Sequence, residues 1–338
     1  MLMTTYSPRS AHGGSLPRLG LAWITWRQHR FAFYGLLGML AGFAMLMVVE
    51  GLRARSTYDQ LGLARCASFT SGTCKQLAQE LFSAYPPSWP LMFLLLLPGA
   101  FGAFIGGPLI ARELEMGTYR FAWTQGAGRT RWLVTKLVLI AAVLVVVTAA
   151  YGVLYTWYNA PLDHVISRAF GNYLGFEFQG IAFPVQTLLA FTAAVFAGLL
   201  IRRTMITVGT VFLASFGLVA ATVFKLRQHY MTPFTTAGSI GPRDWAVDTA
   251  YVDPAGHLLS HAQSQSLHSK WALLSSSGDG LPAVTFGNWL RAQHYTVVTS
   301  YHPAGRFWPF QFIEAGWMGL LILLLGIATI WLLRRRIG

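Results

Sequence analysis

The charged side chains best placed for polar chemistry lie close together, in the segment 112–136. This segment carries seven charged residues in 25, five of them arginine or lysine, and its two acids are Glu113 and Glu115. Long apolar runs stand directly before and after it. Acidic and basic groups in one short segment suit an orientation-specific contact with another protein, where charge sets register and association rate. The alternative is a solvated loop whose basic excess only marks the cytoplasmic side of a membrane.

The rest of the sequence lacks the common nucleotide-binding and catalytic motifs. It contains no Gly-x-x-x-x-Gly-Lys-Ser/Thr phosphate loop, no His-Glu-x-x-His zinc motif and no Gly-x-Ser-x-Gly nucleophile motif. The histidines of the second half have the spacing of solvated loop residues rather than of metal ligands. We therefore expect no catalytic residue, no metal and no cofactor on this chain. The histidines concerned are His257, His261, His268, His294 and His302.

The composition is that of an integral membrane protein. The chain has 338 residues, of which 54% are hydrophobic and only 11% are charged, and its mean hydropathy is +0.48. Soluble proteins carry about 25% charged residues. A net charge of +13 would suit nucleic acid only if it were gathered on one soluble face, and here it is spread between apolar runs.

Six runs without any charged residue are long enough to cross a bilayer. A spanning helix needs about 20 apolar residues, and a charge at the bilayer centre costs about 2.5–3.5 kcal/mol on insertion scales. The sequence therefore predicts an all-α membrane protein with six transmembrane helices. They are expected near 31–50, 91–110, 133–157, 181–201, 204–224 and 313–333.

The segment before the first span has two parts. Residues 1–18 are rich in Gly, Ser and Pro, which predicts a disordered tail. In 19–30, Leu19, Trp23 and Trp26 share one helical face and basic residues follow, which is typical of an amphipathic helix lying at the membrane interface. The alternative is that this segment simply extends the first span. The remaining expected domains are 31–224 with spans one to five and the connector 112–132, the region 225–312, and 313–338 with the sixth span.

Two features of the spans predict how they pack. In the second span, Pro98 frees backbone carbonyls that only protein or water can satisfy, and Gly102 and Gly106 permit close helix approach. We expect this span to pack inside the bundle; the alternative is a mobile hinge. Arg202 and Arg203 are the only residues between the fourth and fifth spans. A tight turn keeps this pair in water, whereas a continuous helix would bury it in lipid.

The distribution of basic residues predicts that both termini are cytoplasmic. The four inner segments then hold 14 of the 25 basic residues but only two of the 12 acidic ones. The region 225–312 becomes extracytoplasmic, and we expect it to form a cap of short helices. Cys66 and Cys74 share one outer loop in an oxidising compartment, where a disulfide is expected and two free thiols are the alternative. Glu50 and Glu314 should lie at outer helix ends in reach of water.

The connector resembles that of a known family. Glu115-Met-Gly117-Thr118, followed by Arg129-Thr-Arg131 and Lys136, resembles the segment after the second span in the membrane subunit of ABC-2 type transporters. The resemblance covers nearly the whole chain and implies a type V exporter-like bundle. Further stretches similar to stand-alone permeases common in actinobacteria are Trp23-Ile-Thr-Trp-Arg-Gln, Ala111-Arg-Glu-Leu-Glu, Ala122-Trp-Thr-Gln and Tyr301-His-Pro-Ala-Gly-Arg-Phe-Trp-Pro-Phe-Gln.

The resemblance implies a role for the connector as a coupling helix seated in a groove of a separate ATPase subunit. ATP and Mg²⁺ would bind to that partner, present in two copies, and a second permease copy or a paralogue would complete the assembly. Gly117 would allow the turn into the helix and Thr118 would cap it. The side chains expected to contact the ATPase or brace the connector are Arg112, Glu113, Glu115, Arg120, Arg129, Arg131 and Lys136.

The expected function is therefore that of a plasma-membrane permease subunit. Export of an apolar or amphipathic substrate follows from the resemblance and from spans that offer aromatic, leucine and small side chains. Two other functions stay open at this point. One is a membrane sensor whose ATPase partner drives signalling, and the other is an intramembrane enzyme acting on lipid or peptide.

Overall fold

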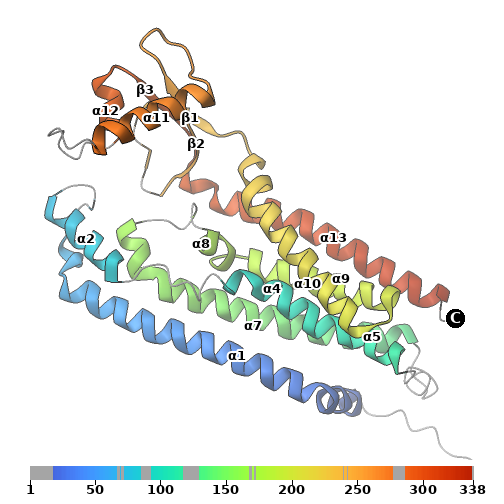
Figure 1. The fold of residues 1–338 in the computed structure, drawn as a ribbon. Coiled ribbons are helices and arrows are strands. Elements are labelled where there is room, and N and C mark those ends of the chain that lie inside the picture. Colours follow the sequence, from blue (N-terminus) through green and yellow to red (C-terminus); the bar gives the residue numbers. More distant parts are fainter. Residues whose placement is uncertain are drawn as a thin grey trace, which may run out of the picture.

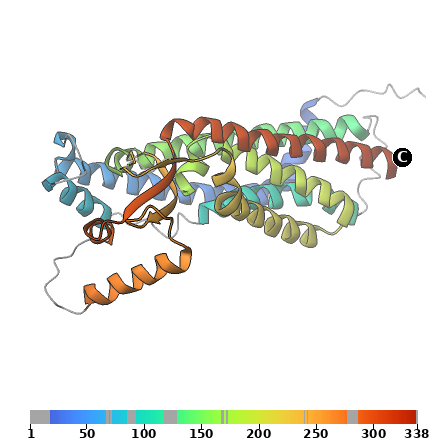
Figure 2. The same cartoon turned by 90° about the horizontal axis from the view of Figure 1, so that it is seen from above.

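The fold is a bundle of long helices with a small β-containing module at one end (Figure 1). Seen from above, the module lies at the end of the bundle opposite to the C-terminus (Figure 2). We define the β module as the three strands and the two α-helices that lie in the sequence between α10 and the last helix, α13. This computed structural model describes residues 18–66, 69, 72–84, 93–116, 129–166, 170, 173–238, 240–241, 243–276 and 286–336.

The first long helix, α1 (Arg18–Gln60), is continuous. The helical path of its 43 residues is about 65 Å long at 1.5 Å per residue, more than twice the hydrocarbon thickness of a bilayer. No non-helical residue separates the predicted interfacial segment 19–30 from the predicted span 31–50, so the two are one helix. The ribbon changes direction within its first turns (Figures 1 and 2). Whether those turns lie at the membrane interface stays a prediction.

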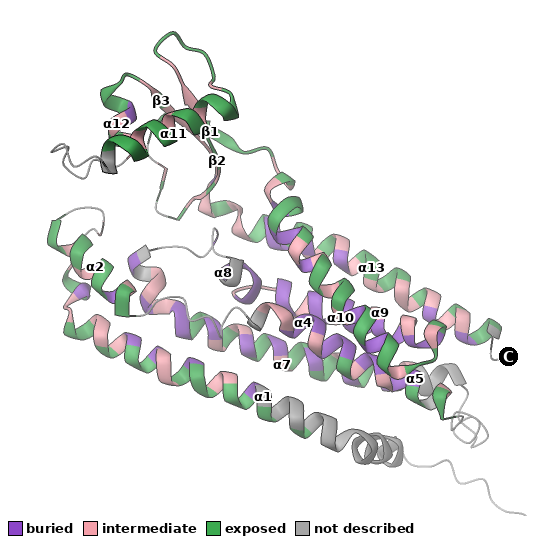
Figure 3. Cartoon of the chain, in the orientation of Figure 1, coloured by how far each residue is buried: buried purple, intermediate pink, exposed green. Residues whose placement is uncertain are grey.

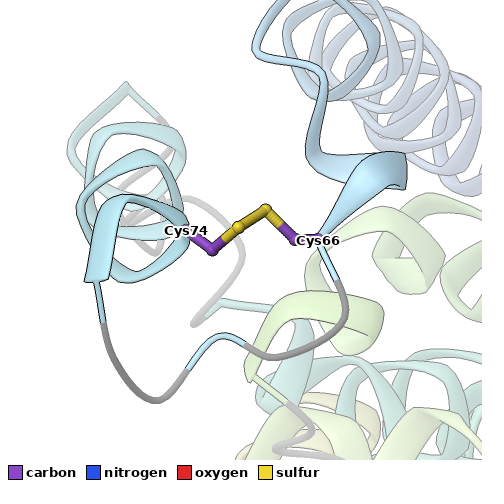
Figure 4. The surroundings of a disulfide bond; sticks show 2 residues. All are labelled: Cys66 and Cys74. Carbon is purple, nitrogen blue, oxygen red and sulfur yellow. A yellow bond between two sulfur atoms is a disulfide. The ribbon is translucent and has the colours of Figure 1, made fainter.

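A disulfide closes the loop that follows α1. The chain passes through η1 (Leu63–Arg65) into α2 (Gly72–Ala84), and Cys66 and Cys74 are bonded with their Cα atoms 5.9 Å apart (Figure 4). Leu63 and Leu81 are fully buried in a small core beneath this loop. Bond and core together hold α2 against the end of α1.

The helix α7 (Arg129–Ile166) runs alongside α1 and contains a proline. Pro161 has no N–H, so the carbonyl of Trp157, four residues earlier, loses its helical donor. Arg55 of α1 donates to that carbonyl instead, and its guanidinium carbon lies 3.9 Å from the centroid of the Trp157 ring. Nearer the middle, the Tyr151 hydroxyl donates to the carbonyl of Leu40 at 2.8 Å. Polar bonds thus pin the two helices at two levels.

The predicted second span is irregular and buried. It consists of η2 (Phe93–Leu96), α4 (Leu97–Phe101), the π-helical turn η3 (Gly102–Gly106) and α5 (Gly107–Glu115). A Cβ at Gly102 would lie 2.3 Å from the Cβ of Ala190, and one at Gly106 would lie 2.7 Å from the carbonyl oxygen of Phe191. The glycines therefore serve close packing against the neighbouring helix. The predicted packing inside the bundle is confirmed.

The neighbouring helices α9 (Ala182–Ile201) and α10 (Thr204–Ala221) are joined by a two-residue turn. Arg202 adopts a left-handed conformation with φ of 57°, and both Arg202 and Arg203 are exposed. The predicted tight turn is confirmed. Beyond α10 the chain stays helical through η4 (Thr222–Leu226) and η5 (Arg227–His229).

Four of the six predicted spans have counterparts that are long and apolar enough to cross a membrane. The described residues do not establish the first two spans, which stay predictions. Purple, buried segments lie along α4 and α9, whereas the outward sides of α1 and α13 are largely exposed (Figure 3). The four counterparts are Val134–Asp163, Ala182–Ile201, Thr204–His229 and Ala304–Arg335.

The β module corrects the expectation of a cap made of short helices. The strand β3 (Thr296–His302) lies between β1 (Phe234–Thr236) and β2 (Trp245–Val252) in an antiparallel sheet. The first four residues of β3 are Thr or Val, and such β-branched residues fit a half-buried sheet surface. The region is also shorter than 225–312, because helical structure continues to His229 and resumes at Ala304. The helices α11 (His261–Ser276) and α12 (Phe286–Ala292) complete it.

An aromatic core joins the module to the last helix, α13 (Phe307–Arg336). Phe170 lies at its centre, 5.2 Å from the ring of Phe310 and 5.4 Å from that of Trp245, both in edge-on contact. Phe176, in the short helix α8 (Tyr173–Phe178), is fully buried beside them. The junction is therefore packed like a protein interior.

Candidate coupling site

Several basic segments meet at the end of the bundle where the chain terminates (Figure 1). We call this the connector end and define it by the end of α5, the 202–203 turn and the end of α13. Arg112 in the last turn of α5 is exposed, as are Arg202 and Arg203 in the turn. Arg334 and Arg335 at the end of α13 are exposed too.

Glu115, the last residue of α5, binds the start of α10. Its Oε2 accepts hydrogen bonds from the backbone N–H of Thr204 at 3.0 Å and from the Thr204 hydroxyl at 2.8 Å. The first N–H groups of a helix have no intrahelical acceptor, and their partial positive charge favours an anion. Arg203, which precedes the helix, provides no side-chain cap. The carboxylate of Glu115 thus caps the N-terminus of α10 in place of the Arg203 side chain.

The charge of Glu115 follows from the same contacts. The backbone N–H of Thr204, and then its hydroxyl, donate to the ionised carboxylate, and the nearby Arg203 adds a favourable charge. These contacts lower the pKa of Glu115 below its ordinary value. The group is therefore ionised at neutral pH, and one of its oxygens is occupied by α10.

The two described basic residues of the predicted set differ in environment. Arg112 is exposed at the surface of the connector end, where a partner protein can reach it. Lys136, in α7, is buried with only 8% of its surface exposed. Its place inside the bundle suits bracing rather than direct contact with another chain.

The structure leaves the other predicted coupling residues open. Gly117, Thr118 and Arg120 lie outside the described residues, so the predicted turn and cap stay predictions. The backbone of Glu113, Arg129 and Arg131 is helical, in α5 and in the first turn of α7, but their side chains lie outside the described part of the structure.

A second polar group, which the sequence reasoning missed, lies at the opposite end of the bundle. Arg227 binds both Glu177 and Glu314, and the exposed fractions of these three side chains are 3%, 3% and 0%. Its guanidinium contacts Glu314 through Nε at 3.2 Å and through a terminal nitrogen at 3.1 Å, and it lies 3.8 Å from the ring of Phe176. Gln186 donates to both carboxylates. We call these four polar residues the buried clamp.

The clamp corrects the expectation that Glu314 faces water at its helix end. Each of its charged members borders an apolar run on the same side of the predicted membrane. Glu177 precedes the fourth span, Arg227 follows the fifth, and Glu314 lies at the start of the sixth. That shared level was the signal available in the sequence. It could not show that the three side chains face one another.

Gln311 of α13 binds the start of α9 and the end of α8, close to the buried clamp. Its Oε1 accepts from the backbone N–H groups of Ile181 and Ala182 at 3.0 and 2.9 Å, and its Nε2 donates to the carbonyl of Phe176 at 2.7 Å. It therefore caps α9 from another helix, as Glu115 caps α10 at the connector end. The module end of α9 is held firmly to α13.

The described residues contain no group of three or more His, Cys, Asp or Glu side chains that could hold a metal ion.

No curated protein and no solved structure matched the chain. A family model described as "ABC-2 membrane transporter related" matches residues 37–227, which is more than half of the chain and includes α5, the connector and the 202–203 turn. The chain is therefore a membrane-embedded member of the ABC-2 membrane transporter related family, a permease component of an ABC-type transporter.

Proposed function

We propose that this chain is an export permease driven by a separate cytoplasmic ATPase, which docks at the connector end. ATP and Mg²⁺ bind to the ATPase, and this chain performs no hydrolysis. Nucleotide-driven movement of the ATPase displaces the connector, and the connector shifts the helices that form the transport path.

The bond between Glu115 and Thr204 is the observation that carries this proposal. A connector that moved as a free loop would transmit little force. Here the last side chain of α5 is bonded to the start of α10, at 2.8 and 3.0 Å, so a displacement of the connector pulls on both helices. Glu115 is then a positioning residue that transmits movement to α10.

The orientation follows from charge and redox chemistry. Exposed arginines gather at the connector end, which suits the cytoplasmic side of a membrane. The disulfide of Cys66 and Cys74 lies at the opposite end, where an oxidising compartment would maintain it. Both termini are then cytoplasmic, in the plasma membrane, and the β module is extracytoplasmic.

The assembly and the substrate are proposed from the family and from the spans. Two ATPase subunits and a second permease, either a copy of this chain or a paralogue, complete the transporter. The substrate class is apolar or amphipathic.

Affinity purification from the native host, with ATPase activity measured on the eluate, tests the coupling role. We expect an ATP-binding subunit to co-purify and to be lost on Glu115→Arg, because the reversed charge faces the start of α10. Glu80→Arg is the matched control, since Glu80 is an exposed acid in α2 at the opposite end. An ATPase retained equally by both variants would refute the role of Glu115. Recovery of the wild-type chain without any ATPase would refute the proposed function.

A further inference from the structure

His302, the last residue of β3, lies at the junction between the β module and the bundle. The sequence predicts a solvated loop histidine, but the structure buries this side chain completely, at 0% exposure. Its ring lies among aromatic side chains, 4.9 Å from the ring of Phe310 and 5.5 Å from that of Trp245. Its two nitrogens therefore need partners inside the protein.

The two partners of the ring fix its protonation state. Arg306 donates from a terminal nitrogen to Nδ1 of His302 at 2.9 Å, since a guanidinium has no acceptor. Nε2 lies 3.2 Å from the carbonyl oxygen of Gln228, which can only accept, so Nε2 carries the hydrogen. His302 is therefore neutral and held in one tautomer. A second proton would attach to Nδ1, where it would break the bond to Arg306 and bring two cations together.

These contacts tie together the two chain segments that join the module to the bundle (Figure 1). One segment runs from η5 to β1, and the other runs from β3 to α13. His302 in the second segment binds Gln228 in η5. Arg306 donates to the carbonyl of Thr232 at 2.7 Å, and its guanidinium carbon lies 4.3 Å from the ring centroid of Phe234. Loss of the bond between His302 and Arg306 would therefore loosen both connections at once.

The other charged groups around the ring have partners of their own. Asp244, which precedes β2, accepts from the backbone N–H groups of Gly241 and Ala304 at 2.9 and 3.0 Å. Among the described residues, Arg306 is the charged group that acts on the ring of His302. The remaining titratable groups that the neighbouring elements contribute, each with a partner, are Arg227, His229, Tyr230, Arg243, Tyr301 and Glu314.

The surroundings of His302 oppose its protonation. Burial lowers the pKa of the imidazole below its ordinary value, the bond to the Gln228 carbonyl acts against this, and the charge of Arg306 adds to the lowering. Because the native pKa is depressed, the junction has its full stability above the ordinary pKa of about 6.5. That stability is lost as the pH falls below this value.

We propose that His302 and Arg306 form a pH-sensitive lock between the β module and the bundle, closed while His302 is neutral and opened by its protonation. Opening uncovers the aromatic core around Phe170 and Phe310, which lies between the module and α13. The inference rests on the proposed function in one respect: the module faces the external medium, so acidification of that medium reaches the lock.

Spin labels on the module and on α13 measure the opening. Cys66 and Cys74 are bonded to each other, so cysteines introduced at Leu258 beside β2 and at Leu323 on α13, 69% and 64% exposed, are the reactive thiols. In lipid nanodiscs, double electron–electron resonance should give one distance above about pH 7 and a second, longer distance below about pH 6.5. The ratio of closed to open protein should fall by up to about tenfold per pH unit, because one proton is bound on opening.

Two substitutions test whether His302 is the group that responds. His302→Gln mimics the neutral tautomer, since its amide oxygen can accept from Arg306 and its NH₂ can donate to Gln228. This variant should stay closed from about pH 8 to about pH 5. Arg306→Gln removes the second cation and offers an acceptor to the protonated ring, so it should respond severalfold less than the wild type. His261→Gln changes an exposed histidine of α11 and should respond like the wild type.

Equal pH responses of the wild type and His302→Gln would overturn the lock and would assign the response to other groups, such as the carboxylates of the buried clamp. A wild-type protein that keeps one distance down to about pH 5 would overturn it as well. Both results are obtained on the purified chain and do not depend on the ATPase. Recovery of the chain without an ATPase would refute the proposed function and leave this pH response measurable.

Discussion

Replacing Arg227 with methionine should strongly destabilise the protein. The substitution removes the cation of the buried clamp and leaves Glu177 and Glu314 facing each other, at 3% and 0% exposure. Breaking a buried ion pair by removing one partner costs about 3–5 kcal/mol, because the remaining charge has neither water nor a counterion. The loss of the contact with the Phe176 ring acts in the same direction. We expect a decrease of this size in the free energy of unfolding.

Arg53→Met is the matched control. Arg53 pairs with Glu50 at 3.1 Å, the distance also found between Arg227 and Glu314, but these side chains are 65% and 35% exposed. Exposed pairs contribute about 0–1 kcal/mol, because water and salt screen them. The two substitutions therefore compare the same chemistry at different burial. Arg53→Met should change the free energy of unfolding by less than about 1 kcal/mol.

SDS-induced unfolding in mixed micelles, followed by the fluorescence of the 12 tryptophans, measures both variants. A third variant adds Glu177→Gln and Glu314→Gln to Arg227→Met. It removes the unpaired charges and should recover a large part of the loss, since neutral replacements of buried ion networks are often tolerated. A cost below about 1 kcal/mol for Arg227→Met, or no recovery in the triple variant, would refute the reasoning.

Two further substitutions test helix contacts by the same unfolding assay. Gly102→Val should lower the free energy of unfolding by about 1–3 kcal/mol, because its Cβ would lie 2.3 Å from a side chain of α9. Gly38→Val is the control and should be tolerated, since nothing lies within 4 Å of a Cβ at that position. Equal effects of the two substitutions would contradict the explanation. Arg55→Met should lower the free energy of unfolding by about 1 kcal/mol, because it leaves the Trp157 carbonyl unpaired. The loss should be smaller in a Pro161→Ala background, where residue 161 again has an N–H for that carbonyl. If the effects of Arg55→Met and Pro161→Ala simply add, the explanation is excluded.

Much of the helical architecture was predictable, because it follows from local rules. Charge-free runs of membrane length predicted the four helices that the structure establishes as long and apolar. Arg202 and Arg203 predicted the turn between α9 and α10, since a charged pair cannot remain in lipid. Gly102 and Gly106 predicted close packing, because small side chains let backbones approach. Each of these predictions used only residues that lie close together in the sequence.

The connector could be located from its charges, but its bonds could not. The sequence predicts that Glu115 contacts the ATPase or braces the connector, but it does not predict the bond to Thr204, which lies 89 positions away. Which residue of α10 meets Glu115 depends on the rotation and height of two packed helices. The periodicity of the sequence does not determine the relative rotation and height of two helices.

Across the whole chain, features of single segments could be predicted from the sequence, whereas contacts between distant segments could not. Membrane insertion, helix positions and the tight turn depend on how single segments partition between water and lipid, so the amino-acid order is sufficient to predict them. The clamp of Arg227, Glu177 and Glu314, the sheet of the β module and the capping of α9 by Gln311 depend on which side chains face one another across separate elements. Those pairings are settled by packing in three dimensions, where a buried polar group must find a partner that any of several distant segments could supply.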